Sequence, residues 1–364
     1  MQNNKLRMAI RATAALTVLG LASQAQAFEI EAGDVKADIY GYARLTATYD
    51  INEQLAADNS TLAGDFGRVS GSDNEGHFDA SAAQSRIGVR TMLPQDVKVV
   101  IEGDFASGGN FRLRHAFGEY NGILAGQTWS NFSSFTGNTP TLDFNGAAGW
   151  AGYQARTAQL RYTTGGLSVS AEDPKGSIDG GTKKDGTPAF TARYEGSSDA
   201  LSFSAAGLVK QNSYDDSDTG GEDDSTLGYG VFGAAKLQAT DTLSIQGNVV
   251  YTDGANGYLY LSGGADAFVD SNDELESVSG IGGSLGASLA LGSGRSVNLV
   301  YGMTQLDVDA SAAEETRSNI LANYMWTPVT NVMMGVEYQY WKTETKGGDS
   351  EDANRLMFAA QYNF

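Results

Sequence analysis

The sequence has no cysteine, only two histidines and little positive charge, and each shortage removes a class of function. Of its 364 residues, 24 are lysine or arginine and 44 are aspartate or glutamate, giving a formal charge of −20. The lack of cysteine excludes a disulfide framework, a thiolate zinc site and a cysteine nucleophile. His77 and His115 leave little material for histidine-based catalysis. The acidic balance argues against a nucleic-acid partner, because a phosphate backbone needs a basic surface.

Long apolar runs are also scarce, and the one short run lies at the N-terminus. Three basic residues precede an apolar run over 12–22, and Ala25-Gln26-Ala27 fits the small-x-small cleavage rule. We therefore predict a signal peptide over 1–27 and a mature chain over 28–364. The run is shorter than the ~20 residues of a spanning helix, which argues against a retained anchor. Cleavage would leave 337 residues with a charge of −23, either soluble or folded as a membrane β-barrel.

What the sequence does contain is strict alternation of apolar and polar residues. From Lys36 to Asp50 the odd positions are apolar or small and the even positions are polar or aromatic. This segment exceeds the ~5–6 residues of a typical soluble strand and suits the tilted strands of a membrane barrel. The chain also ends on an alternating strand that closes with Phe364, as outer-membrane barrels do. Similar alternation recurs near 86–105, 159–162, 190–205 and 319–326.

The connections between these strands alternate in length. We predict seven short turns, near 94–96, 121–122, 165–166, 196–199, 240–241, 292–294 and 328–331. We predict eight longer loops, near 52–78, 107–110, 130–155, 174–188, 212–225, 253–274, 307–315 and 344–352. Fifteen connections imply an all-β, transmembrane antiparallel β-barrel of about 16 strands, with short periplasmic turns and long outer loops. We expect Tyr40, Trp129, Tyr194, Trp326 and Trp341 to form its interfacial aromatic girdles.

The third outer loop, Ser130 to Ala155, is rich in aromatic residues, which suits a segment that packs against a wall. In general porins the third outer loop folds into the lumen and narrows it. We expect the same here, with Asp143, Phe144 and Trp150 in the constriction loop. The alternative is a loop that stays outside the barrel.

Three segments around this loop resemble the DcaP-like outer-membrane porins: Phe111 to Glu119, Leu124 to Phe132 and Thr141 to Gly146. The close match runs from about Ser81 to Pro174. The resemblance implies a homotrimeric, sixteen-stranded porin of a Gram-negative outer membrane, in contact with lipid and lipopolysaccharide. It also implies small, often anionic solutes, of which dicarboxylates are best known. Some members carry a coiled-coil-like helix ahead of the barrel, whereas only 28–35 precede the first predicted strand here.

Parity within each strand places eight basic side chains on the face that would line the lumen. They are Arg44, Arg86, Arg90, Lys98, Arg112, Arg114, Arg161 and Arg193. Arginine keeps its charge and binds carboxylates through two parallel hydrogen bonds, so such a ladder would guide carboxylate solutes. The same residues could instead pair with Glu102, Asp104 and Asp143 to brace the wall and the loop. Both roles are compatible.

The sequence thus predicts an outer-membrane porin for passive diffusion of small hydrophilic solutes, favouring anions such as dicarboxylates. A non-selective or cation-preferring porin is one alternative, and a barrel hydrolase with a histidine-paired serine or aspartate is another. His115 has the parity of Leu113 and Phe117, so we expect it to face lipid or a neighbouring subunit rather than act in catalysis. We expect no cofactor and no metal, since the acidic run over 215–224 lacks calcium-loop spacing.

Overall fold

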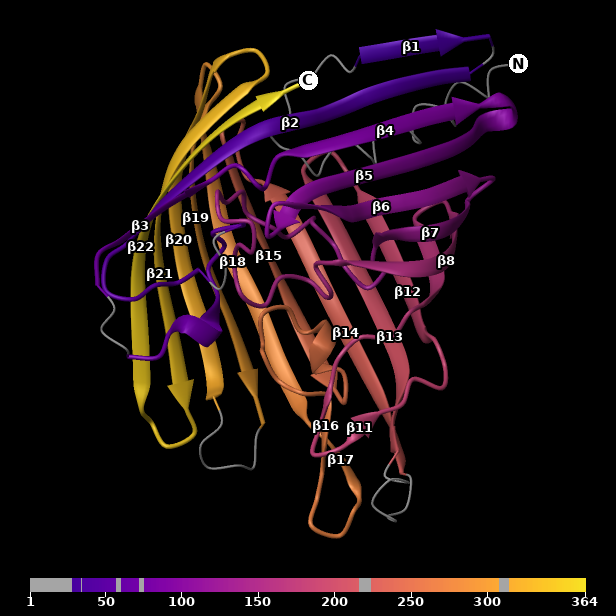
Figure 1. Ribbon diagram of the computed structural model, residues 1–364, viewed down its shortest axis with the longest axis vertical. Helices are drawn as coiled ribbons and strands as arrows, with labels where there is room; N and C mark the ends of the chain where they lie inside the picture. The colour runs from indigo at the N-terminus through magenta and orange to yellow at the C-terminus, as the bar shows by residue number, and fades with distance from the viewer. Residues whose placement is uncertain (1–27, 34, 57–59, 72–74, 216–223, 308–313) are drawn as a thin grey trace.

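The fold is a closed antiparallel β-barrel of sixteen strands, seen in the computed structural model (Figure 1). The structure describes residues 28–33, 35–56, 60–71, 75–215, 224–307 and 314–364, so the predicted signal peptide lies outside it. Each barrel strand pairs with two neighbours, and the last strand, β22, closes the ring against β2. No helix in the described part of the chain has the length and apolar character needed to cross a membrane.

The barrel strands differ widely in length. They are β2 (Val35–Asp50), β4 (Arg86–Leu93), β5 (Val97–Ser107), β6 (Asn110–Tyr120), β7 (Ile123–Trp129), β8 (Arg156–Thr164), β9 (Leu167–Glu172), β12 (Ala189–Ser197), β13 (Leu201–Asp215), β14 (Ser225–Gln238), β15 (Leu243–Asp253), β18 (Ser279–Gly292), β19 (Arg295–Leu306), β20 (Glu314–Val329), β21 (Val332–Thr345) and β22 (Ser350–Asn363). β18 to β22 have 12 to 16 residues each, whereas β7 has 7 and β9 has 6. We call β4 to β9 the short wall and β18 to β22 the long wall.

Shorter elements complete the chain. β1 (Phe28–Ala32) pairs with the first half of β2, and β3 (His77–Ser81) with its second half. β11 (Thr182–Lys183) pairs with β13. In the outer loops, β10 (Ile178–Asp179), β16 (Ala267–Val269) and β17 (Leu275–Ser277) form a small separate sheet. The three short 3-10 helices are η1 (Phe66–Arg68), η2 (Pro94–Asp96) and η3 (Asn256–Tyr258).

The predicted turns and strand count are confirmed. All seven predicted short turns lie at the junctions of consecutive barrel strands on one rim, which also holds both ends of the described chain. In bacterial barrels this is the periplasmic side. We call it the turn side, and the opposite rim the loop side. At the seam, the amides and carbonyls of Gly41 and Phe364 bond to each other at 3.0 Å, so the ring closes at its last residue.

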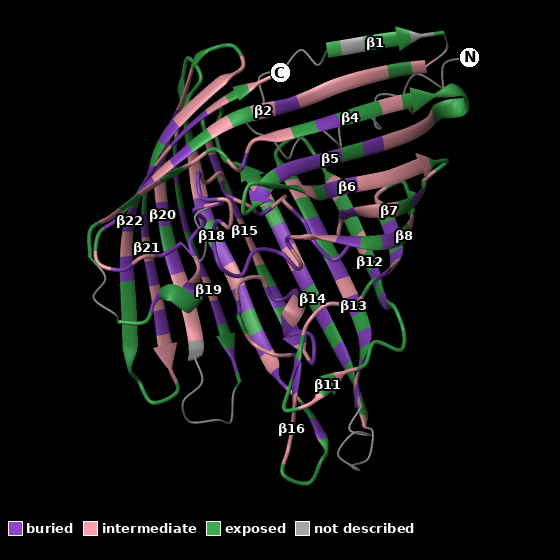
Figure 2. Ribbon diagram, viewed as in Figure 1, coloured by how far each residue is buried: buried purple, intermediate pink, exposed green. Residues whose placement is uncertain are grey.

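Burial alternates along the strands as period-2 geometry requires, visible in Figure 2 as bands of exposed and buried residues. Leu45, Leu160 and Leu285 keep 45%, 58% and 65% of their surface exposed on the outer face. Their neighbours Thr46 and Gln159 are buried on the inner face. The outer face is apolar because it meets lipid, and the inner face is polar because it meets water and the loops.

One strand breaks the alternation, and the expectation for His115 is wrong. Glu102 of β5 pairs with His115, whereas the next residue, Gly103, pairs with Leu113, so Arg114 is an extra residue in a β-bulge. The bulge shifts the phase of β6, and His115 turns inward. It is buried there, with Nδ1 2.9 Å from Thr128 Oγ1.

The expected aromatic girdles are only partly correct. Tyr194 is half exposed on the outer face, and Trp326 packs beside Tyr324 with ring centroids 5.4 Å apart. Tyr40 instead points inward and donates a hydrogen bond to Glu102 at 3.0 Å. Trp341 is fully buried inside the barrel. Both residues occupy inward positions of their strands. The face on which a residue lies therefore decides whether it can join a girdle, whatever its position along the strand.

Candidate functional site

The third outer loop, residues 130–155 between β7 and β8, folds into the lumen as expected. Thr139 Oγ1 accepts a hydrogen bond from Gln246 of β15, and the carbonyl of Pro140 accepts one from Asn323 of β20. The carbonyl of Gly146 accepts another from Asn319 of β20. The loop therefore follows the inner surface of the barrel across to the long wall before it returns to β8.

A carboxylate on the long wall holds the middle of this loop. The two oxygens of Glu337 accept hydrogen bonds from the backbone N–H groups of Leu142 and Asp143, at 2.7 and 3.0 Å. Asn323 and Gln339 donate to the same carboxylate at 2.9 Å each. Glu337 is buried. A buried carboxylate needs this many donors, so the docked loop and the wall residue depend on each other.

Asp143 is buried against the wall beside Glu337 and does not line open space. Its Oδ2 accepts from the Gly64 backbone N–H at 2.9 Å and from Gln339 Nε2 at 3.1 Å. Burial raises the pKa of Asp143 above the usual aspartate value. The nearest described cation is Arg355, at 4.0 Å, which is itself held by Asp50 of β2 at 2.9 Å.

Glycines on the long wall let the loop lie flat against it. A Cβ placed on Gly302 of β19 would lie 2.3 Å from the carbonyl oxygen of Ala148. A Cβ on Gly335 of β21 would lie 2.8 Å from Leu142. At Gly302 the contact is with backbone and leaves no room for a side chain, whereas at Gly335 the Leu142 side chain would have to move.

The first and sixth outer loops reinforce this packing. In the first, Phe66 packs on Trp341 of β21 with ring centroids 4.6 Å apart. In the sixth, Tyr258 packs on Phe132 of the third loop at 6.0 Å, and Asp266 forms a buried ion pair with Lys210 of β13. The loops therefore cover the side of the lumen from β13 round to β2. On the short wall the third loop is held at β9, where Glu172 accepts hydrogen bonds from Ser130 Oγ and from the Asn131 N–H at 2.6 Å each.

Two of the eight predicted lumen cations fasten the third loop. Arg44 Nη2 donates to the carbonyl of Leu142 at 2.6 Å, and Arg193 Nη1 donates to the carbonyl of Ser133 at 2.6 Å. Their guanidinium groups point inward, as parity predicts. Their main contacts are with the loop backbone.

Four more cations of the set pair with wall carboxylates, the bracing role that the sequence left open. Arg114 is buried and contacts Glu102 and Asp104 at 2.9 Å each. Arg112 binds Asp104 through two hydrogen bonds, at 3.0 and 2.9 Å. Lys98 pairs with Glu119 at 3.6 Å, and Arg86 approaches Glu102 at 3.1 Å. Asp143 takes no part in this bracing.

The last two predicted cations, Arg90 and Arg161, have no carboxylate within 4 Å among the described residues. Arg90 is exposed and stacks on Tyr40, 5.0 Å from the ring centroid. Arg161 lies on β8, and its Nε has no hydrogen-bond partner in the described structure. Neither side chain therefore has the bracing role that the other members of the set show.

Parity missed a further cation, Arg156, the first residue of β8. Its guanidinium stacks on Trp129, 4.8 Å from the ring centroid, and has no carboxylate partner among the described residues. It lies within electrostatic range of Arg86, Arg112 and Arg114. Among the described residues, the cluster thus holds four guanidinium groups and two carboxylates, Glu102 and Asp104, which pair with Arg86, Arg112 and Arg114. By this count it has an excess of two positive charges. Parity would place Arg156 on the outer face with Leu160 and Tyr162. Its position at the start of the strand, where the third loop ends, was the one sign in the sequence that it could turn inward.

The other two expected constriction residues, Trp150 and Phe144, lie in different surroundings. Trp150 is largely buried on the loop side, stacked on Tyr260 at 6.1 Å. Phe144 reaches across the lumen, with its ring centroid 5.6 Å from the guanidinium carbon of Arg114. The loop and the short wall therefore approach each other at Phe144, beside the arginine cluster.

Comparison with known proteins identifies the family. The sequence matches the profile of the DcaP outer membrane protein over residues 2–364. The chain belongs to the DcaP outer membrane protein family. The outer membrane channel DcaP of Acinetobacter baumannii shares 29% identity with this DcaP-family chain, with a TM-score of 0.82, covering 93% of this chain and 99% of that one. A search of curated proteins found no match.

More distant solved structures share the fold alone. OmpT of Vibrio cholerae is 12% identical with a TM-score of 0.61, covering 93% of this chain and all of the other. An anion-selective porin from Comamonas acidovorans is 13% identical with a TM-score of 0.60, covering 91% of this chain and all of the other. The family and the Acinetobacter channel place this DcaP-family barrel in a Gram-negative outer membrane as a porin.

We predict that Gly302→Val reduces the conductance of the channel. The new side chain would overlap the backbone of Ala148 and push the third loop off the wall into the lumen. Gly233→Val is the matched control, because a Cβ at Gly233 meets nothing within 4 Å. Planar-bilayer recordings of single channels would measure the effect. Equal conductance in the two variants would contradict the prediction that the third loop lies directly against Gly302.

We also predict that Glu337→Gln loosens the loop. An amide offers one acceptor oxygen in place of two, so one of the Leu142 and Asp143 N–H groups is left facing an amide nitrogen. The loss of a charged hydrogen bond costs about 1.5–3 kcal/mol, so closures in single-channel recordings should become at least tenfold more frequent. The exposed Glu276→Gln of the sixth loop should leave closure frequency unchanged.

Proposed function

We propose that this barrel passes small hydrophilic solutes and prefers anions, dicarboxylates among them. The observation that carries the proposal is the excess of arginine on the short wall, opposite the docked third loop. Arg156 has no carboxylate partner among the described residues, and two positive charges of its cluster remain uncompensated. The overall charge of −20 would suggest the opposite preference.

The arrangement suits a solute with two carboxylates. Arginine stays charged at all physiological pH values and holds a carboxylate through two parallel hydrogen bonds. Arg156 lies at the loop-side end of β8, and Arg161 lies five residues further toward the turn side. One carboxylate can engage the cluster around Arg156 while the solute moves toward Arg161. The low-dielectric protein wall beside the cluster strengthens these interactions relative to those in bulk water.

The experiment measures ion preference and succinate block in the Arg156→Gln variant. We expect the wild-type channel to show an anion-selective reversal potential in a salt gradient. In the variant, succinate should block about tenfold more weakly, which corresponds to about 1.4 kcal/mol. Lys342→Gln is the charge-matched control, because Lys342 lies on the outer face of β21, paired with Glu344 at 2.6 Å. Cation preference of the wild-type channel would refute the proposal.

The second part of the proposal is a homotrimer that associates through the short wall. A tilted strand needs about 9–11 residues to span the membrane, and β7 and β9 have 7 and 6. Their outer residues are nevertheless apolar and exposed, as Ile123, Leu167 and Val169 show. An apolar surface too short to border a full bilayer is best covered by protein, and a second copy is the simplest cover.

The absence of cysteine makes this association simple to test. A single cysteine at Leu160, in the middle of the short wall, should give linked dimers with a short bismaleimide in outer-membrane preparations. A cysteine at Leu285 of β18, equally exposed on the long wall, should remain uncrosslinked. Crosslinking at Leu285 alone would place the subunit contact on the long wall instead.

A further inference from the structure

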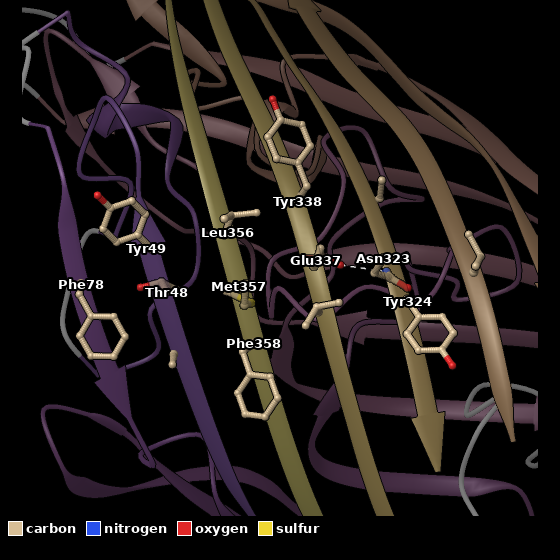
Figure 3. A pocket seen from close by; sticks show the side chains of 14 residues that line it. Thr48, Tyr49, Phe78, Asn323, Tyr324, Glu337, Tyr338, Leu356, Met357 and Phe358 are labelled. Carbon is tan, nitrogen blue, oxygen red and sulfur yellow. Dashed lines mark hydrogen bonds between the residues drawn. The ribbon is translucent and has the colours of Figure 1, made fainter. Parts of the chain in front are cut away.

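The outer face of the long wall and of the adjoining strands β2 and β3 carries an apolar groove of about 540 Å³ (Figure 3). Its lining includes the outward-facing side chains of Tyr49, Phe78, Tyr324, Tyr338 and Phe358, which the view shows on the same face of their strands. Two small residues, Ala47 and Ala322, lie among them and lower the floor. Behind the floor, Glu337 bonds to Asn323 on the inner face, where the same strands hold the third loop.

The pairing register shows the path of the groove. Ala322 of β20 lies opposite Tyr338 of β21, Tyr338 opposite Leu356 of β22, and Leu356 opposite Tyr49 of β2. One end lies at Val297, the third residue of β19 after its turn, and the other at Tyr49, the last but one residue of β2. The groove therefore climbs obliquely across the wall from the turn side to the loop side.

The groove faces lipid rather than another subunit. Strands β19 to β22 have 12 to 16 residues, enough to span the hydrocarbon with a tilt, unlike β7 and β9. Its lining is almost wholly apolar, and the hydroxyl of Tyr338 is bonded to Asn354 at 2.5 Å. An apolar channel open to the hydrocarbon along its length suits an acyl chain.

A cation lies at the turn-side end of the groove. Arg295 of β19 is paired with Trp326 of β20. This pair lies two residues from the Val297–Tyr324 pair, about 7 Å nearer the periplasm. Arg295 is exposed, its Nε donates to the carbonyl of Gly292 at 3.3 Å, and no described carboxylate lies within 4 Å of it. Trp326 beside it is the residue type that marks a membrane–water interface.

We propose that the groove binds one acyl chain of an inner-leaflet phospholipid whose phosphate is held by Arg295. Arginine suits phosphate, and the chain then runs upward from Val297 over Ala322 toward Tyr49. Lipopolysaccharide, with its phosphates on the outer side, is less suited. At the loop-side end Lys342 is already paired with Glu344 at 2.6 Å, and Asp352 lies close by, bonded to Asn354.

The test measures the lipid retained by the intact protein. Wild type and variants would be reconstituted in nanodiscs of phosphatidylethanolamine, released into mild detergent and weighed by native mass spectrometry. We expect about one retained phospholipid per subunit in the wild type. Arg295→Gln should lower retention about tenfold through loss of the charged contact. Ala322→Trp should lower it similarly by filling the groove.

Two controls separate the groove from general effects. Lys36→Gln removes a cation on the turn side, far from the groove and paired with Glu31 at 3.3 Å, and should retain lipid as the wild type does. Leu285→Trp adds the same ring to the outer wall outside the groove and should also retain it. Arg295 is the exposed first residue of β19, so its variant keeps the test decisive if Ala322→Trp fails to fold.

Four results would overturn the proposal. The wild type could retain no phospholipid, or it could retain lipopolysaccharide in preference when both are offered. Full retention by Arg295→Gln would refute the headgroup contact. Loss of oligomer in Ala322→Trp with unchanged lipid content would show that the groove is a subunit contact. None of these outcomes depends on which solute passes through the channel.

Discussion

The structure depends on one constraint, the need of every backbone polar group in hydrocarbon for a partner within the protein. It forces the strands into a closed ring, which β2 and β22 complete at Gly41 and Phe364. A closed ring divides each strand into an apolar outer face and a polar inner face. The inner face is then a surface of hydrogen-bonding side chains to which the outer loops can bind, and Glu337 shows how one such side chain holds a loop.

The docking of the third loop decides which charges a solute meets. The loop lies on the long wall because glycines such as Gly302 admit its backbone and Glu337 accepts its N–H groups. The short wall carries the arginine cluster of Arg86, Arg112, Arg114 and Arg156. The acidic members of the loop and wall, Asp143 and Glu337, are buried against each other rather than exposed to the lumen. Under the proposed anion preference, the sign of the charge that a solute meets follows from this packing and not from the overall composition.

Alternation and turn chemistry were sufficient to predict the strands, the turns and the position of the third loop, because period-2 burial is a local property. The site was less predictable. Parity placed Arg44 and Arg193 inward correctly but could not show that both would bind loop carbonyls, since those contacts join distant parts of the chain. It failed for His115 because a single bulge at Arg114 shifts the phase of β6, and bulges leave little trace in a sequence. Tyr40 and Trp341 were misplaced for a related reason, since position along a strand was given more weight than face.

The two walls of the barrel also differ in how well their outer surfaces match the thickness of the bilayer. A short wall leaves apolar residues that a full bilayer does not match, and protein is the surface that fits them. A long wall matches the bilayer and must instead accommodate chains of lipid at every irregularity of its surface. The irregularity on the long wall arises at Ala47 and Ala322, where small residues stand among Tyr49, Tyr324 and Tyr338. The same strands that hold the third loop on their inner face thus form the groove on their outer face. The proposed lipid and the docked loop would therefore lie on opposite faces of this one wall.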